Sequence, residues 1–291
     1  MKTKQTPRRT TRTSALLVLL PLALMLIMTR DASAQLYWNT NGTNATWTGS
    51  VWGAGNPAGP YSGAWVGSSN VVFGVSSTGT NLVTFATATV GDITVNGNTT
   101  ITQGGTVTTK SGGSTVNVAD GVTLTWASQA RSTAAGGFNW TKSGNGTWDM
   151  GGSSGNGAAG SSFTINAGTV IAGGSGAYGG SATALNINGG VLTVSGTRTF
   201  ANTNIVIGGN FGLSNVSGGI ATFSGNVNLG SGVRTITYAS SNTTTFSGSI
   251  TNTGGLTITN NASGTGRLTL SGSNSFSGGV TLNSGRLNIN N

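Results

Sequence analysis

Residues 276–290 read FSGGVTLNSGRLNIN, and two similar stretches stand upstream: FSGNVNLGSGVRTIT at 223–237 and FSGSITNTGGLTIT at 246–259. Within residues 280–289, apolar Val, Leu and Ile alternate with polar residues on either side of a short turn that contains Gly. Alternation with period two predicts β-strands. Recurrence at intervals of about 20–50 residues is typical of solenoids and arrays. We therefore expect the three copies to stack on one another as successive rungs.

The same strand–turn–strand pattern recurs at 185–194 (LNINGGVLTV) and at 163–170 (FTINAGTV). One rung cannot bury its apolar face alone, whereas rungs stacked about 4.8 Å apart form a continuous core. The pattern predicts an all-β fold, a right-handed parallel β-helix or β-solenoid. A β-sandwich is the alternative, because Asn-Gly pairs are typical of hairpin turns. Such pairs occur at 41–42, 96–97, 145–146, 156–157 and 188–189.

The composition favours a folded β-protein that lacks disulfide bonds. The chain has 291 residues, of which 51 are Gly and 6% are charged, and it contains no Cys and no His. It is rich in the β-branched residues Val, Ile and Thr, which disordered chains usually lack. Gly at the corners supplies positive φ angles without a steric penalty. Stability must therefore come from packing and backbone hydrogen bonds.

Residues 1–34 have the order of a secretory signal peptide. A basic segment is followed by an apolar run at 15–28 and by the small residues Ala32-Ser33-Ala34. We expect this segment to be removed, leaving no permanent membrane span. The remaining chain carries seven basic residues and three Asp, a net charge of +4. The basic residues are scattered singly along the sequence, which argues against a nucleic-acid partner.

The rest of the chain divides into a Trp-rich segment, 35–75, and solenoid repeats, 76–291. We expect the Trp-rich segment to cap the N-terminal end of the core. The alternative is that its Trp residues bind a cell-surface glycan, because the amphipathic indole ring suits the apolar faces of sugars. The possible carbohydrate contacts are Trp38, Trp47, Trp52 and Trp65.

Few residues are available for catalysis or metal binding. The acids of the expected mature chain are Asp92, Asp120 and Asp149, each of which we interpret as a turn or rim residue. A glycosidase normally uses two acids that flank the scissile bond, and Zn²⁺ sites use Cys and His. We predict no catalytic residues, no metal and no cofactor, hence no enzyme. A groove in which Asp149 meets Lys142 or Arg131 would favour a polysaccharide-active enzyme instead.

The C-terminal stretch 266–291 resembles the autotransporter-associated β-strand repeat, also called the passenger-associated transport repeat. The positions that carry the resemblance are Leu268, Leu270, Gly272, Asn274, Phe276, Gly278, Gly279, Leu282, Gly285 and Leu287. A diverged copy lies at 140–172, where Trp148 and Met150 replace the two leading Leu residues. The Trp-rich segment is also similar to the start of such proteins.

The resemblance implies an exported protein with an extended β-helical shape and repeats that assist its export. It implies a location outside the cell, on the cell surface or at the outer membrane, with the periplasm as a transit compartment. The expected role is non-enzymatic and structural or adhesive. A carbohydrate-binding module and a polysaccharide-active β-helix remain as alternatives. The last motif lacks the polar cap usual for terminal repeats. We therefore expect an open rung that pairs with another copy of the chain or continues into a longer passenger.

Overall fold

The computed structural model describes residues 35–38, 45–46, 52–54, 67–74, 79–127, 138–152, 159–216, 218–239, 243–260 and 266–290. The expected signal segment, 1–34, lies outside these residues. Every regular element in the described part is a β-strand, and no helix there is long and apolar enough to cross a membrane.

The strands form two long sheets of 11 strands each. The first sheet contains, in spatial order, β3 (Trp52–Ala54), β1 (Gln35–Trp38), β4 (Asn70–Phe73), β7 (Ile93–Val95), β10 (Ser114–Val118), β12 (Asn139–Ser143), β14 (Ser162–Ile165), β16 (Ala184–Ile187), β19 (Asn204–Ile207), β22 (Asn226–Asn228) and β25 (Ile250–Thr251). The second sheet contains β2 (Ala45–Thr46), β5 (Asn81–Phe85), β8 (Thr99–Gln103), β11 (Thr123–Ala127), β13 (Thr147–Asp149), β15 (Thr169–Ala172), β17 (Val191–Ser195), β20 (Phe211–Val216), β23 (Arg234–Ala239), β26 (Leu256–Asn260) and β28 (Val280–Leu282).

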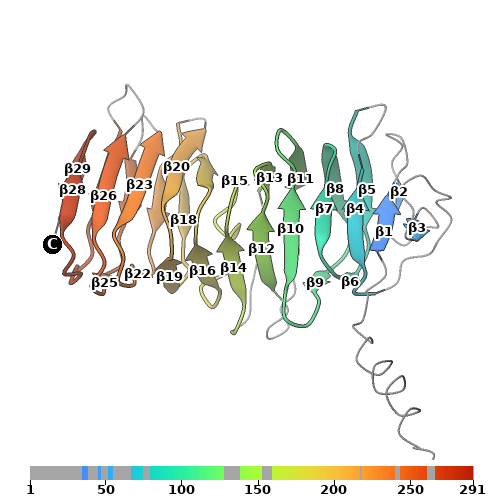
Figure 1. Cartoon of the computed structure of the whole chain (residues 1–291), viewed down its shortest axis with the longest axis horizontal. Helices are drawn as coiled ribbons and strands as arrows, with labels where there is room; N and C mark the ends of the chain where they lie inside the picture. Colours follow the sequence, from blue (N-terminus) through green and yellow to red (C-terminus); the bar gives the residue numbers. More distant parts are fainter. Residues whose placement is uncertain are drawn as a thin grey trace, which may run out of the picture. The chain divides into compact units, whose positions relative to one another are not determined.

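A third side is built differently at the two ends. Towards the C-terminus it is a sheet of five strands, β18 (Arg198–Phe200), β21 (Ala221–Phe223), β24 (Thr243–Phe246), β27 (Arg267–Leu270) and β29 (Leu287–Ile289). Towards the N-terminus the described third side is the pair β6 (Ala88–Val90) and β9 (Val107–Thr109). In Figure 1 the strands of successive rungs lie side by side, from β1 to β29.

Every described strand pair except β1 with β3 is parallel, which confirms the predicted β-solenoid. It has about nine rungs. The described Asn-Gly pairs turn corners between sheets. Asn188-Gly189, for example, lies between β16 of the first sheet and β17 of the second. A hairpin would instead join antiparallel neighbours of one sheet. The β-sandwich alternative is therefore wrong.

The expected stacking of the three FSG motifs is correct for two of them and wrong for the third. Phe223 pairs in register with Phe246, but the next residue in this column is Leu270. Phe276 lies elsewhere, beside β25, where Ser275 N donates to Ile250 O of that strand and Ser277 N donates to Asn252 O just after it. The correct equivalent of the motif is thus Leu-Ser-Gly at 270–272. Leu replaced Phe there and hid the register.

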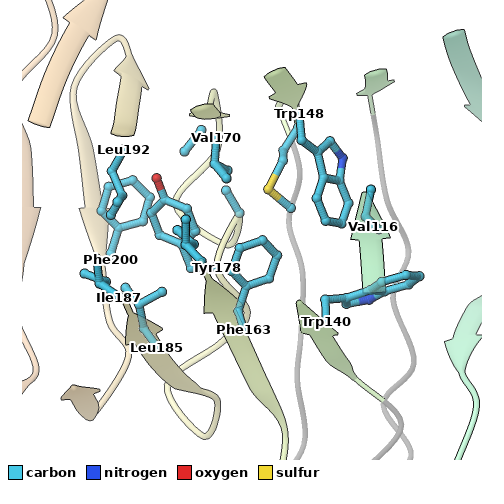
Figure 2. Packing of buried hydrophobic residues seen from close by; sticks show 14 of the residues in the cluster. Val116, Trp140, Trp148, Phe163, Val170, Tyr178, Leu185, Ile187, Leu192 and Phe200 are labelled. Carbon is cyan, nitrogen blue, oxygen red and sulfur yellow. The ribbon is translucent and has the colours of Figure 1, made fainter. Parts of the chain in front are cut away.

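The core runs continuously through the solenoid and is lined by inward residues of all sides. Figure 2 shows part of it, where Phe163 of the first sheet lies beside Tyr178, and Tyr178 lies beside Phe200. The rings of Phe200, Phe223 and Phe246 follow one another at 5.0 and 5.1 Å. Burial of such rings is the largest hydrophobic contribution available to each rung.

The solenoid includes part of the predicted Trp-rich segment. Leu36 and Trp38 of β1 pair in register with Val71 and Phe73 of β4, and β4 pairs with β7. On its other edge β1 pairs with the antiparallel strand β3. Most of residues 39–66 lies outside the described part, so the capping role of 35–75 stays a prediction.

Candidate functional site

The proposed carbohydrate contact Trp38 is a core residue. Its side chain is 1% exposed and meets Phe73 edge to face, with ring centroids 6.0 Å apart. Alternation in β1 points it inwards beside Leu36, so in this structure it offers no face to a sugar. Trp47, Trp65 and the side chain of Trp52 lie outside what the structure describes. Carbohydrate binding by those three residues stays a prediction.

Asp149 and Lys142, which together would have favoured an enzyme, are not brought together. The Asp149 side chain is half-buried and accepts a hydrogen bond from Gly151 N at 2.9 Å. Lys142 is an inward residue of β12 with no exposed surface. Arg131 lies outside the described residues. The described residues contain no group of three or more acid, His or Cys side chains that would hold a metal ion.

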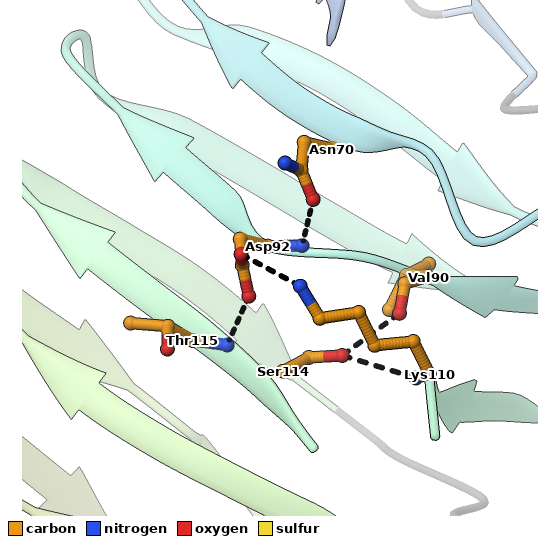
Figure 3. A network of polar contacts seen from close by, with 6 residues as sticks. All are labelled: Asn70, Val90, Asp92, Lys110, Ser114 and Thr115. Carbon is orange, nitrogen blue, oxygen red and sulfur yellow. Dashed lines mark hydrogen bonds and ion pairs between the residues drawn. The ribbon is translucent and has the colours of Figure 1, made fainter. Parts of the chain in front are cut away.

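Asp92 forms a corner network between the N-terminal rungs (Figure 3). Its carboxylate accepts hydrogen bonds from Lys110 Nζ at 2.7 Å and from Thr115 N at 2.9 Å. Its own backbone N donates a hydrogen bond to Asn70 Oδ1 at 2.8 Å. Ser114 Oγ closes the next corner by donating to Val90 O at 2.8 Å. All these bonds join one rung to the next. The network therefore aligns the corners of successive rungs, and both carboxylate oxygens of Asp92 are hydrogen-bonded within it.

Lys142 is the most unusual polar residue of the core. It pairs in register with Val116 on one rung and with Ile165 on the next. Its ammonium donates to Ser143 O at 2.6 Å, Gly144 O at 2.7 Å and Ala167 O at 3.2 Å. Burial lowers the pKa of Lys142 to about 8. The side chain thus ties two successive corners between the first and second sheets.

The sequence contained a sign of this inward Lys that we did not use. Trp140 and Lys142 are two residues apart in one strand, so they share a face. Because Trp140 is a core residue, alternation alone places Lys142 inside as well.

The repeat-motif residues divide between buried positions and the exposed last rung. Leu268 and Leu270 are buried in β27, and Asn274 Oδ1 accepts a hydrogen bond from Ile250 N at 3.0 Å. Gly272 is buried where a Cβ would overlap Gly248 O of the preceding rung. The motif therefore joins each rung closely to the one before.

The other motif residues belong to the last rung and its corners. Gly278 lies against the backbone of Gly254 and Gly255, and Gly279 adopts a positive φ of 75°. Gly285, also at positive φ, lies where a Cβ would overlap the Tyr238 hydroxyl. These positions require Gly.

The last rung exposes side chains that are buried in the equivalent positions of earlier rungs. Val280 pairs with Leu256 and Leu282 with Ile258, yet Val280 is 37% and Leu282 is 47% exposed. Ile289 is 52% exposed, while Phe276 and Leu287 are half-buried against the core. No described strand covers this face.

Although the basic residues stand singly in the sequence, the fold brings the last two together. Leu268 pairs with Leu287, and Leu268 N donates to Arg286 O at 3.0 Å, so Arg267 and Arg286 are neighbours on successive rungs. Both are exposed. The tripeptide Gly-Arg-Leu stands at 266–268 and again at 285–287, and this repetition was visible in the sequence.

Comparison with protein-family models gives a match to the passenger-associated-transport-repeat at residues 141–172 and 261–289. The repeat is therefore confirmed at both places where the sequence predicted it. The first matched segment covers β13, β14 and β15 with most of β12, and the second covers β27, β28 and β29. Comparisons with curated proteins and with solved structures gave no significant match.

Proposed function

We propose that this protein is an exported, non-enzymatic passenger with a structural or adhesive role at the cell surface, and that its repeats assist export. The observation that carries the proposal is the match of the transport-associated repeat to two segments of one continuous β-solenoid. The signal-like order of residues 1–34 supports the same reading.

Export is tested by producing the full chain in a bacterium with an outer membrane and digesting intact cells with protease. We expect cleavage of the full chain and protection of a variant that lacks residues 1–34. Retention of the full chain inside the cells would overturn the proposed location.

The transport role of the repeat needs a control that separates it from folding. Leu270 lies within a matched segment, and its register partner Phe246 lies outside one. Phe246→Ala should destabilise the fold at least as much as Leu270→Ala, because it removes a larger buried side chain. We expect Leu270→Ala nevertheless to reduce export more. An export loss that simply follows the loss of stability would show that the repeat acts through folding alone.

The exposed apolar face of the last rung supports a partner as well. We propose that the chain from residue 35 to 291, when purified, self-associates through this face, because exposed strand edges and core positions favour further β-pairing. Sedimentation should show concentration-dependent assembly that Leu282→Asp abolishes. Val233→Asp, at a corner residue that is 62% exposed, is the control and should leave assembly unchanged. Equal behaviour of both variants contradicts this interface.

A further inference from the structure

The C-terminal half of the solenoid carries only positive charge. After Asp149 the sequence contains no acid, but it contains four Arg residues, at 198, 234, 267 and 286. The ion pair of the described residues, Lys110 with Asp92, lies in the N-terminal half. A cation in the C-terminal rungs therefore has no acid nearby in the sequence to neutralise it.

Two of these Arg residues are engaged with the backbone. Arg198 Nε donates to Gly173 O at 2.6 Å, and Arg234 Nε donates to Leu229 O at 3.2 Å. They hold corners, as Lys142 does in the core.

The other two, Arg267 and Arg286, form an exposed pair on the outward face of the third sheet. Leu268 and Leu287 point into the core, so alternation directs the preceding residues outwards. Extending the register of β27 and β29 by one residue places Arg267 beside Arg286, which directly precedes β29, and neighbouring strands lie about 4.8 Å apart. Like charges directly opposite each other destabilise a sheet. Residues 150–291 contain no acid that would relieve this repulsion.

Hydrogen-bonding side chains continue along this face. Asn288 and Thr245 lie in the same outward row and are half-buried, whereas Thr269 between them is only 8% exposed. The face thus combines two guanidinium groups with the partly accessible amide of Asn288 and hydroxyl of Thr245. Guanidinium groups bind sulfate, phosphate and carboxylate groups in bidentate fashion.

We infer that Arg267 and Arg286 form an anion-binding site for an acidic polysaccharide that lies along the outward face of the third sheet. The acidic groups meet the Arg pair, and the sugar hydroxyl groups meet the half-buried side chains of Asn288 and Thr245. This names a ligand class for the adhesive role proposed above and takes its biological meaning from that proposal. Binding is measured on purified protein, so its test is independent of the test of export.

The test is binding of dextran sulfate, with unmodified dextran of the same length as the neutral comparison. We expect binding that weakens as salt rises, and at least a tenfold loss of affinity in the double variant Arg267→Thr/Arg286→Thr. Lys110→Thr is the control, because it removes one positive charge from a corner that Asp92 already neutralises. It should change affinity less than twofold. Thr243→Arg, which extends the Arg column by one rung, should increase affinity several-fold.

A second readout separates the site from general effects of charge on folding. At low salt and without polymer, Arg267→Thr should raise the unfolding temperature. Addition of dextran sulfate should raise the unfolding temperature of the original protein but leave that of the variant unchanged. Equal losses of affinity in Lys110→Thr and Arg267→Thr would overturn the site in favour of net charge. Equal binding of neutral dextran would overturn charge recognition. Equal or tighter binding of single-stranded DNA of matched length would overturn the polysaccharide as ligand class.

Discussion

The N-terminal and C-terminal rungs solve the same packing problem in different ways. In the C-terminal rungs the third side is a five-stranded sheet, and Phe200, Phe223 and Phe246 stack with interplanar angles of 28° and 17°. In the N-terminal rungs the described third side is a two-stranded sheet, and the core contains Trp126, Trp140 and Trp148. Here edge-to-face contacts occur, such as 80° between Trp126 and Trp140. Trp126 and Trp148, in contrast, are stacked at 26°. The Phe rings therefore repeat one orientation from rung to rung, whereas the larger Trp rings meet in two different orientations.

The largest effect should come from breaking the Phe stack. Phe223→Ala removes a ring buried between two others, so we expect a loss of about 3–5 kcal/mol in the free energy of unfolding, measured by denaturant titration. Hydrogen exchange should show the loss of protection concentrated in the neighbouring rungs, because each rung contacts mainly its neighbours. Thr222→Ala, an outward neighbour in the same strand, should change stability by less than about 0.5 kcal/mol. A small effect of Phe223→Ala would show that the stack is not a main source of stability.

The next largest effect should be a pH dependence of stability caused by Lys142. Its folded-state pKa of about 8 lies below the ordinary value of 10.5, so the unfolded chain binds more protons between these pH values. Stability should therefore rise as pH increases from 8 to 10.5, by up to roughly 3 kcal/mol. Below pH 8 the lysine is charged in both states and its contribution is constant. Lys142→Met should remove this part of the pH dependence, and identical slopes in the two proteins would contradict the assignment.

A substitution at a stacked corner should have a smaller effect. A Cβ at Gly248 would overlap Gly225 O of the preceding rung. We expect Gly248→Ala to cost about 1–3 kcal/mol, in the range of overpacked cores. The control is Gly152→Ala, where no atom lies within 4 Å of the added Cβ and the effect should be near zero. Thermal unfolding measures both, and equal shifts would show that corner contact is not the cause.

Replacing either of two buried tyrosines by Phe should change stability by a similar amount, but in opposite directions. The hydroxyl of Tyr178 lies in the core with no hydrogen-bond partner among the described residues, whereas Tyr238 Oη accepts from Arg286 N at 2.8 Å and donates to Arg286 O at 3.0 Å. Tyr178→Phe extends the Phe stack and should stabilise the protein by about 1 kcal/mol. Tyr238→Phe should destabilise it by about 1 kcal/mol. Denaturant midpoints that move in the same direction would contradict this reading.

The sequence predicted the class of fold because its determinants are local. Alternation identifies the strands, and Gly identifies the corners, as at Gly285 with its φ of 90°. Register was harder, because it depends on which residues meet across rungs. Leu270 replaces Phe in the column of Phe246, so a search for FSG selected Phe276 instead. The pairing of Arg267 with Arg286 likewise needed the register. The inward position of Lys142 was predictable because it stands two residues from Trp140 in the same strand. The carbonyl groups that hold its ammonium were not predictable.

The smallest expected effect concerns charge, and it takes opposite signs in the two halves. Lys110→Ala removes the half-buried ion pair with Asp92 and should lower stability by at most about 1 kcal/mol at low salt. High salt screens this pair, so the difference should disappear near 1 M, where the Debye length is about 3 Å. The same salt should relieve the repulsion between Arg267 and Arg286. Hydrogen exchange at two ionic strengths should therefore show lower protection around β7 and higher protection around β29 as salt increases. A uniform response would mean that charge does not distinguish the two halves, and that their difference lies in packing alone.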